Sequence, residues 1–158
     1  MTKLSLAFFL SLAAIAALPA AAHAAPGGVA LHGDVKVETT TIVNGVEKTV
    51  LAVPKIVIPG NRLLFSTAYR NEGAAPVQNF VVTNPVPAGI AVAALDAASL
   101  IVSVDGGKSW GKLAGMTVRD AKNVPHPAQA TDVTHVRWTV ASIAPGAGGS
   151  VAYHAVVR

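Results

Sequence analysis

The chain has 158 residues, of which 52% are hydrophobic and 13% are charged, and its formal net charge is +4 at pH 7. This composition excludes a disordered, highly charged tail and a nucleic-acid binder that neutralises many phosphates, so we expect no nucleic-acid partner. The chain has no cysteine, which excludes disulfides, thiolate metal sites and cysteine nucleophiles.

Residues 1–24 have the features of a secretory signal peptide. Lys3 precedes an uncharged apolar run, residues 4–18, and Ala22-His23-Ala24 has the small-residue pattern of a cleavage site. As a helix the apolar run rises about 22 Å, less than the roughly 30 Å of a bilayer's hydrocarbon core. We expect cleavage after Ala24, export to the periplasm or the cell surface, and no stable membrane span afterwards.

Residues 25–54 are predicted to form a short lead and a β-hairpin. In residues 35–40, apolar or threonine side chains alternate with polar ones, the pattern of a half-buried strand. Asn44-Gly45 suits a two-residue hairpin turn, and residues 46–53 form the returning strand. Between Pro54 and Pro59, residues 55–58 are predicted to form an edge strand.

Residues 55–158 are predicted to form one all-β domain, an immunoglobulin-like Greek-key β-sandwich. Short apolar stretches recur roughly every 10 residues between Gly, Pro and Asn, and no long stretch has helical periodicity. The predicted strands are 63–69, 77–83, 90–92, 100–104, 109–113, 133–143 and 150–157, with a short helical turn at 95–99. We expect the last two strands to form a hairpin, with Val140 opposite Val151.

The predicted core consists of the inward-facing side chains of these strands, with Trp138 at its centre. Its members are Phe65, Tyr69, Phe80, Val82, Val102, Val136, Trp138, Val140, Val151, Tyr153 and Val157.

Five motifs occur in a recognisable order. They are Ile58-Pro59-Gly60-Asn61-Arg62-Leu63, Tyr69-Arg70-Asn71-Glu72-Gly73, Val82-Thr83-Asn84-Pro85-Val86-Pro87-Ala88-Gly89, Val136-Arg137-Trp138-Thr139-Val140 and Ile143-Ala144-Pro145-Gly146. In this order they resemble the domain-of-unknown-function eleven family, the conserved repeat domain of bacterial and archaeal surface proteins. The resemblance covers about residues 56–157 and implies an immunoglobulin-like sandwich. In these motifs we expect Asn71 and Gly73 to take positive φ at a hairpin tip.

His135 and His154 are the only metal-ligand candidates that we single out. If Trp138 and Tyr153 face inward, both histidines face outward, and the predicted hairpin makes them diagonal neighbours. One interpretation is a weak surface site for copper or zinc. The other, which we favour because no ligand-spaced motif accompanies them, is that they are ordinary exposed strand residues.

The segment from Asp105 to Trp110 also has two interpretations. It is either a loop that holds calcium or a sugar, with Trp110 as a stacking platform, or a plain hairpin turn whose Trp covers the sandwich edge. We favour the turn, because a lone Asp among glycines lacks the alternating acids of a calcium loop.

The sequence does not indicate an enzyme, and we expect no cofactor. It contains neither a Gly-x-Ser-x-Gly elbow nor a Ser-x-x-Lys motif. Its carboxylates are dispersed along the chain, without the adjacent pairs that would suggest glycoside hydrolysis.

The leading hypothesis is therefore an exported, non-catalytic β-sandwich that acts as a cell-envelope structural or protein-interaction module, with another envelope or secreted protein as partner. The alternative is a periplasmic small-ligand or metal-binding protein. Contacts are expected at the sheet edges and at three rim loops, residues 70–77, 84–90 and 105–110. The candidate contact residues are Asn71, Glu72, Asn84, Asp105, Lys108 and Trp110.

Overall fold

The computed structural model describes residues 28–158, and the expected signal peptide lies outside the described residues. The described part is mostly antiparallel β-structure, which confirms the all-β prediction. The larger sheet has the strand order β2-β1-β3-β10-β5. Its strands are β1 (Val29–Val43), β2 (Val46–Ala52), β3 (Arg62–Asn71), β5 (Ile90–Val92) and β10 (Gly148–Val157).

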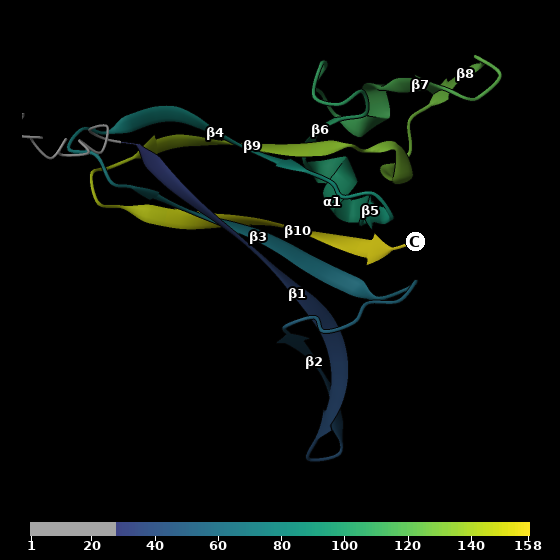
Figure 1. Ribbon diagram of the computed structural model, residues 1–158, viewed down its shortest axis with the longest axis horizontal. Coiled ribbons are helices and arrows are strands. Elements are labelled where there is room, and N and C mark those ends of the chain that lie inside the picture. The colour runs from purple at the N-terminus through teal and green to yellow at the C-terminus, as the bar shows by residue number, and fades with distance from the viewer. Residues whose placement is uncertain (1–27) are drawn as a thin grey trace, which may run out of the picture.

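The second sheet has the order β4-β9-β6 and lies over the larger one, so that β4 and β9 face β3 and β10 as a second layer (Figure 1). Its strands are β4 (Val77–Pro85), β6 (Ile101–Ser103) and β9 (His135–Ile143). A cross-layer hydrogen bond joins the two sheets, because Asn84 Nδ2 on β4 donates to Thr67 Oγ1 on β3 at 2.7 Å.

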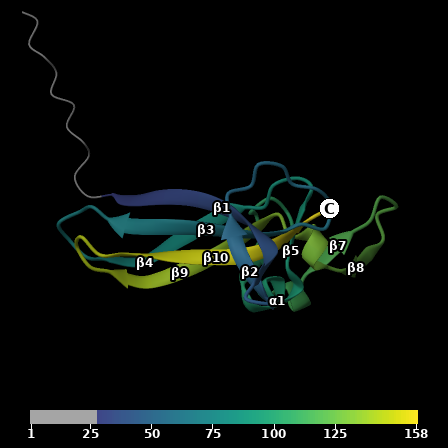
Figure 2. The ribbon, with the colours of Figure 1, turned by 90° about the horizontal axis from the view of Figure 1, so that it is seen from below.

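Short elements connect and cover these layers. They are the helix α1 (Ala94–Ser99), the 3-10 turns η1 (Leu113–Gly115) and η2 (Ala130–Asp132), and the strands β7 (Thr117–Arg119) and β8 (Pro125–Pro127). Figure 2 shows the β7–β8 ribbon at one end of the molecule and the β3–β4 and β9–β10 connections at the other. The predicted helical turn at residues 95–99 is confirmed as α1.

The core lies between the two sheets. Val102 and Val136 of the smaller sheet are fully buried against Tyr153 of β10, which is 1% exposed. Trp138, expected at the centre, is partly buried and packs on Tyr153 with ring centroids 6.2 Å apart. Of the predicted core, Val82, Val102, Val136 and Tyr153 are buried; the partly buried members are Phe65, Tyr69, Phe80, Trp138, Val140, Val151 and Val157.

The predicted amino-terminal hairpin is confirmed. Asn44 (φ 52°) and Gly45 (φ 77°) take the two positive-φ positions of the turn between the paired residues Val43 and Val46. The first strand is longer than predicted, because β1 begins at Val29 and pairs with β3 as far as Glu38. The hairpin therefore belongs to the larger sheet.

The predicted hairpin between the last two strands is wrong. β9 pairs with β4 and β6, while β10 pairs with β3 and β5, so Val140 lies opposite Phe80 and Val151 opposite Thr67. Both strands have an apolar face, and placing them in opposite layers buries these faces against each other. A hairpin would have left both faces in one layer.

Two further predicted strands are absent. Residues 55–58 form no strand, and the Ile58 N–H donates to Asn61 Oδ1 at 3.0 Å. Pro54 and Pro59 have no N–H to donate to a neighbouring strand. Residues 109–113 also form no strand, because the Asp105 carboxylate binds the Ser109 N–H and only Gly111 bridges to Val102.

Candidate interaction surface

The large exposed hydrophobic side chains of residues 28–158 gather on one segment. Nine of the fourteen lie within residues 42–58, and these are Ile42, Val43, Val46, Val50, Leu51, Val53, Ile56, Val57 and Ile58. We call residues 39–58 the apolar arm. Gathered exposed apolar surface of this kind is unusual on folded monomers and makes this segment a candidate interaction surface.

The pairing of β1 explains why the arm is exposed. β1 pairs with both β2 and β3 at Val37 and Glu38, but from Thr39 onward it pairs with β2 alone. This two-stranded ribbon leaves the two-layered body (Figure 1), and its side chains from Thr39 to Leu51 are exposed on both faces. Isolated two-stranded ribbons are marginally stable in water, so the arm depends on its root and on its turn.

A cluster of polar side chains, Glu38, Arg62 and His154, lies at the root of the arm. Glu38 is the last β1 residue paired with β3, and its Oε2 accepts a hydrogen bond from Arg62 Nε at 2.7 Å. Its Oε1 lies 3.5 Å from His154 Nε2, and the Glu38 side chain is 14% exposed. Glu38 therefore links β1 to β3 and β10 where the arm leaves the body.

The same cluster covers part of a sheet edge. β5 pairs with β10 only at residues 155–157, and next to it the His154 backbone N–H donates to Asp96 Oδ2 while the Ala93 N–H donates to the His154 carbonyl at 2.8 Å. His154 Nδ1 also lies 3.1 Å from Asp96 Oδ2. The segment that leads into α1 thus bonds the edge of β10 at His154, directly beside the residues that pair with β5.

An apolar groove of about 390 Å³ lies at the base of the arm. Val35, Leu63, Phe65 and Ile90 line it from the larger sheet, and two loops contribute residues 54–57 together with Pro87 and Ala88. The groove extends the exposed apolar surface of Ile56 and Val57 toward the body.

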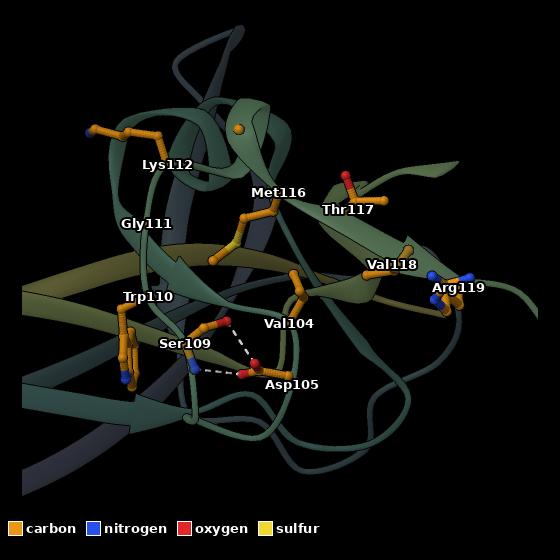
Figure 3. Close-up of a pocket in the computed structure, with 11 residues that line it drawn as sticks. Val104, Asp105, Ser109, Trp110, Gly111, Lys112, Met116, Thr117, Val118 and Arg119 are labelled. Atoms are coloured by element: carbon orange, nitrogen blue, oxygen red, sulfur yellow. Dashed lines mark hydrogen bonds between the residues drawn. The ribbon is translucent and has the colours of Figure 1, made fainter. Parts of the chain in front are cut away.

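The Asp105 loop is a self-contained turn. Asp105 Oδ1 accepts hydrogen bonds from Ser103 Oγ, Lys108 N and Ser109 N at 2.7–3.0 Å, and its Oδ2 accepts from Ser109 Oγ at 2.6 Å. The two bonds to Ser109 are drawn in Figure 3. These donors, Ser109 first, hold the pKa of the Asp105 carboxyl well below its usual range. Both oxygens of the Asp105 carboxylate thus accept hydrogen bonds from its own loop. A calcium ion at this position would need the same oxygen lone pairs.

Trp110 covers the outer face of β9. Its Nε1 donates to the Gly107 carbonyl at 2.9 Å, and the Arg137 guanidinium lies 3.7 Å from its ring centroid. The His135 ring meets it edge-on at 6.1 Å. The indole thus stacks on an arginine of its own chain, and its polar atom is bonded within the loop.

A cleft of about 950 Å³ opens between this loop and β7 (Figure 3). Its two cations, Lys112 and Arg119, lie on opposite sides of the view and donate to the carbonyls of Ser99 and Asn123. The cleft therefore lacks the convergent polar groups of a specific ligand site.

The structure separates the two histidines that the sequence paired. His135 is on β9 in the smaller sheet and bonds to Thr134 Oγ1 at 3.1 Å, whereas His154 is on β10 in the larger sheet. The prediction that they are diagonal neighbours is wrong, because it relied on the β9–β10 hairpin. Within residues 28–158 no group of three or more His, Asp or Glu side chains is placed to hold a metal ion.

Asn71 has an internal role. It is fully buried, and its Nδ2 donates to the carbonyls of Ala75 and Ile143 at 2.8 and 2.9 Å, while its Oδ1 accepts from the Gly73 N–H. Neither Asn71 nor Gly73 has positive φ, so that prediction is wrong. The β3–β4 connection crosses between sheets, and the Asn71 side chain shapes it in place of a hairpin turn.

The remaining predicted contact residues differ in accessibility. Glu72 and Lys108 are exposed. The Glu72 backbone N–H donates to the Gly28 carbonyl, and the Lys108 backbone N–H donates to the Asp105 carboxylate. Asn84 is partly buried in its bond to Thr67. The rim loops thus present few free polar groups from the predicted set.

The interpretation of the sequence missed the arm as a surface. The signal was residues 50–58, an apolar run interrupted only by Pro54 and Lys55. Such a run is typical of a buried strand. Its exposure becomes clear only from the strand pairing, because beyond Glu38 the hairpin of β1 and β2 has no further strand beside it in the described part of the chain.

No helix in residues 28–158 is long and apolar enough to cross a membrane. The chain matches no family profile, no curated protein and no solved structure in the comparisons.

Proposed function

We propose that this protein is an exported, non-catalytic β-sandwich that acts as a cell-envelope structural or protein-interaction module, with the apolar arm as its contact surface. The arm's nine exposed hydrophobic side chains are the observation that carries the proposal. In this proposal the two sheets have immunoglobulin-like Greek-key connections, as in the conserved repeat domain that the sequence resembles.

The size of the exposed surface supports a contact role. Six of the nine residues are more than half exposed, and these are Ile42, Val46, Leu51, Val53, Ile56 and Ile58. Gathered exposed apolar surface of this kind is typical of interaction sites. Burying such surface contributes about 25 cal/mol per Å² before the costs of association.

The polar groups support a non-catalytic role. Asp105, the carboxylate that accepts the most hydrogen bonds within residues 28–158, binds donors that close a loop, and Glu38 binds Arg62 at the root of the arm. His154 lies between two carboxylates within the same root cluster. These groups serve the fold, and none is left as a free nucleophile beside a base.

Export is supported by residues 1–24 and is tested by expressing the full chain in a bacterium and fractionating the cells. We expect the protein outside the cytoplasm with an amino terminus that reads Ala25-Pro26-Gly27. Cytoplasmic protein that retains Met1 would contradict this part of the proposal.

The contact role is tested by cross-linking the processed protein in envelope extracts. Ile56 and Leu95 are 83% and 85% exposed, but Ile56 is on the arm and Leu95 is on α1. We expect discrete cross-linked species with the wild type and with Leu95→Asp, and their loss with Ile56→Asp. Equal capture by both variants would remove the arm from the proposal.

A further inference from the structure

β2 presents a long, regular strand edge with no neighbour. It is the last strand of its sheet, spans seven residues, and contains neither Pro nor a positive-φ residue. The free edge of β4 is interrupted by Asn79 at φ 51° and ends in Pro85, while β5 and β6 have three residues each. In the two main sheets of residues 28–158, β2 is therefore the edge best suited to pair with another strand.

The hairpin turn determines which β2 groups face outward. A two-residue turn closes on the pair Val43–Val46, and in an antiparallel ladder this pair and every second pair after it exchange both backbone hydrogen bonds. Residues 46, 48, 50 and 52 therefore point their N–H and C=O groups toward β1. Glu47, Thr49 and Leu51 point theirs away from it, and this set is symmetric about Thr49.

We propose that the arm docks on the arm of a second copy of this chain, with the two β2 strands paired antiparallel about a two-fold axis at Thr49. This inference rests on the proposed function of the arm as a contact surface. The register places Thr49 opposite Thr49 and each Glu47 opposite the other copy's Leu51, so all three outward-facing residues find partners.

Side-chain charges favour the same register. A two-fold axis at Glu47 or Lys48 would place like charges directly opposite each other, which destabilises a strand pair. With the axis at Thr49, Lys48 lies opposite Val50 and the central pair is Thr with Thr, a favourable cross-strand combination.

The apolar residues are arranged in a self-complementary way along the arm. Ile42, Val43 and Val46 lie at its tip, and Val53, Ile56 and Val57 lie at its base, while its middle is rich in Thr and contains Lys48. Antiparallel placement of two arms brings each tip alongside the base and apolar groove of the other. Each copy of a stable dimer buries roughly 800 Å², and the exposed apolar residues at the tip and base of the arm contribute to such a contact.

Two variants at one position test the pairing. Thr49→Pro removes the outward-facing N–H and leaves in place the neighbouring backbone groups that bond β1, whereas Thr49→Val keeps the N–H and the β-branched shape. By sedimentation equilibrium we expect a dimer for the wild type and for Thr49→Val. We expect at least a tenfold weaker dimer for Thr49→Pro, with an unchanged circular dichroism spectrum.

Because the chain has no cysteine, a single introduced thiol tests the register. Directly opposite strand residues have Cα atoms about 5.5 Å apart or closer, within reach of a disulfide. We expect Thr49→Cys to form a covalent dimer under mild oxidation at low protein concentration. Leu95→Cys, on α1, is the matched control and should remain monomeric.

A monomeric wild type up to its solubility limit, or equal cross-linking of Thr49→Cys and Leu95→Cys, would overturn this inference. If the wild type is monomeric and Ile56→Asp still abolishes capture of an envelope protein, the proposed function stands without self-pairing. If the dimer forms and no captured species depends on Ile56, self-pairing stands and the contact with another envelope protein fails.

Discussion

The ring of Tyr153 stacks on the ring of Phe65, with centroids 5.1 Å apart and planes 8° from parallel. The Tyr153 hydroxyl is buried and has no hydrogen-bond partner in the described part of the chain. The core is therefore organised around an aromatic stack on the larger sheet, and that stack includes one unsatisfied polar atom.

Tyr153→Phe is expected to leave the free energy of unfolding unchanged or to raise it by about 1 kcal/mol, because it removes a buried hydroxyl that lacks a partner. Tyr153→Ala should cost about 3–5 kcal/mol through the cavity that it leaves. Urea unfolding followed by tryptophan fluorescence measures both. A loss of more than 1 kcal/mol in Tyr153→Phe would show that the hydroxyl is bonded in solution.

The same residue predicts behaviour at high pH. Burial raises the pKa of Tyr153 to about 12, against about 10 in the unfolded chain. The stability linked to this group is fully present below pH 10 and is lost as the pH rises from about 10 to about 12. Unfolding curves between pH 9 and 12 should therefore fall less steeply for Tyr153→Phe than for the wild type.

Asp105→Asn is expected to destabilise the protein at neutral pH, because an amide nitrogen cannot accept the hydrogen bond from Ser109 Oγ. The folded-state pKa of Asp105 is lowered, so its contribution is present above the unfolded pKa of about 4 and is lost as the pH falls below it. Melting temperatures of variant and wild type should converge in acid. The control is Asp34→Asn, at an exposed pair with Lys36, which should shift little.

Asn71→Ala is expected to cost about 3 kcal/mol, since it leaves the buried Ile143 carbonyl, the Ala75 carbonyl and the Gly73 N–H without their partner. Asn71→Asp should cost more, because a carboxylate would face the Ala75 and Ile143 carbonyls. Gln78→Ala, at an exposed strand position, is the control. Denaturant unfolding measures the free energy of unfolding of each variant. Equal losses in Asn71→Ala and Gln78→Ala would contradict the structural role of the buried Asn71 side chain.

Local signals in the sequence were sufficient for one local element, the amino-terminal hairpin. Asn44-Gly45 and the alternation around it predicted the hairpin, because the turn and its flanking strands depend on neighbouring residues. The partner of a strand is decided by distant residues. β9 and β10 are close in sequence and both apolar on one face, which fits a hairpin as well as the observed crossing between layers.

The candidate surface was less predictable for a related physical reason. The apolar run in residues 50–58 indicates burial if a neighbouring strand or layer is present, and exposure if it is not. Only the end of β1–β3 pairing at Glu38 distinguishes the two cases. Likewise, Asn71 ends β3 and Asp105 stands in a loop, in segments whose composition suggests exposed contacts, yet their side chains bond inward.

Adding copper or zinc to the protein without residues 1–24 is expected to leave its melting temperature unchanged, because His135 and His154 lie on different sheets. His154 already interacts with Asp96 and Glu38, so His154→Gln should lower the melting temperature equally with and without metal. A stabilising shift with metal that His154→Gln abolishes would instead support the metal-binding alternative.

Glu38→Gln is expected to loosen the arm without unfolding the body. The Glu38 carboxylate bonds Arg62 at 2.7 Å and lies 3.5 Å from His154, at the last residue where β1 still pairs with β3. Beyond this point the ribbon has only its own ladder, so weakening the root should speed amide hydrogen exchange in residues 39–52 more than in β9. The matched control is Glu47→Gln, beside the turn, which removes the same charge from the same hairpin and should leave exchange at residues 37 and 38 unchanged. Uniform acceleration in β9 and the arm would mean that Glu38 stabilises the whole sheet and not the root of the arm in particular.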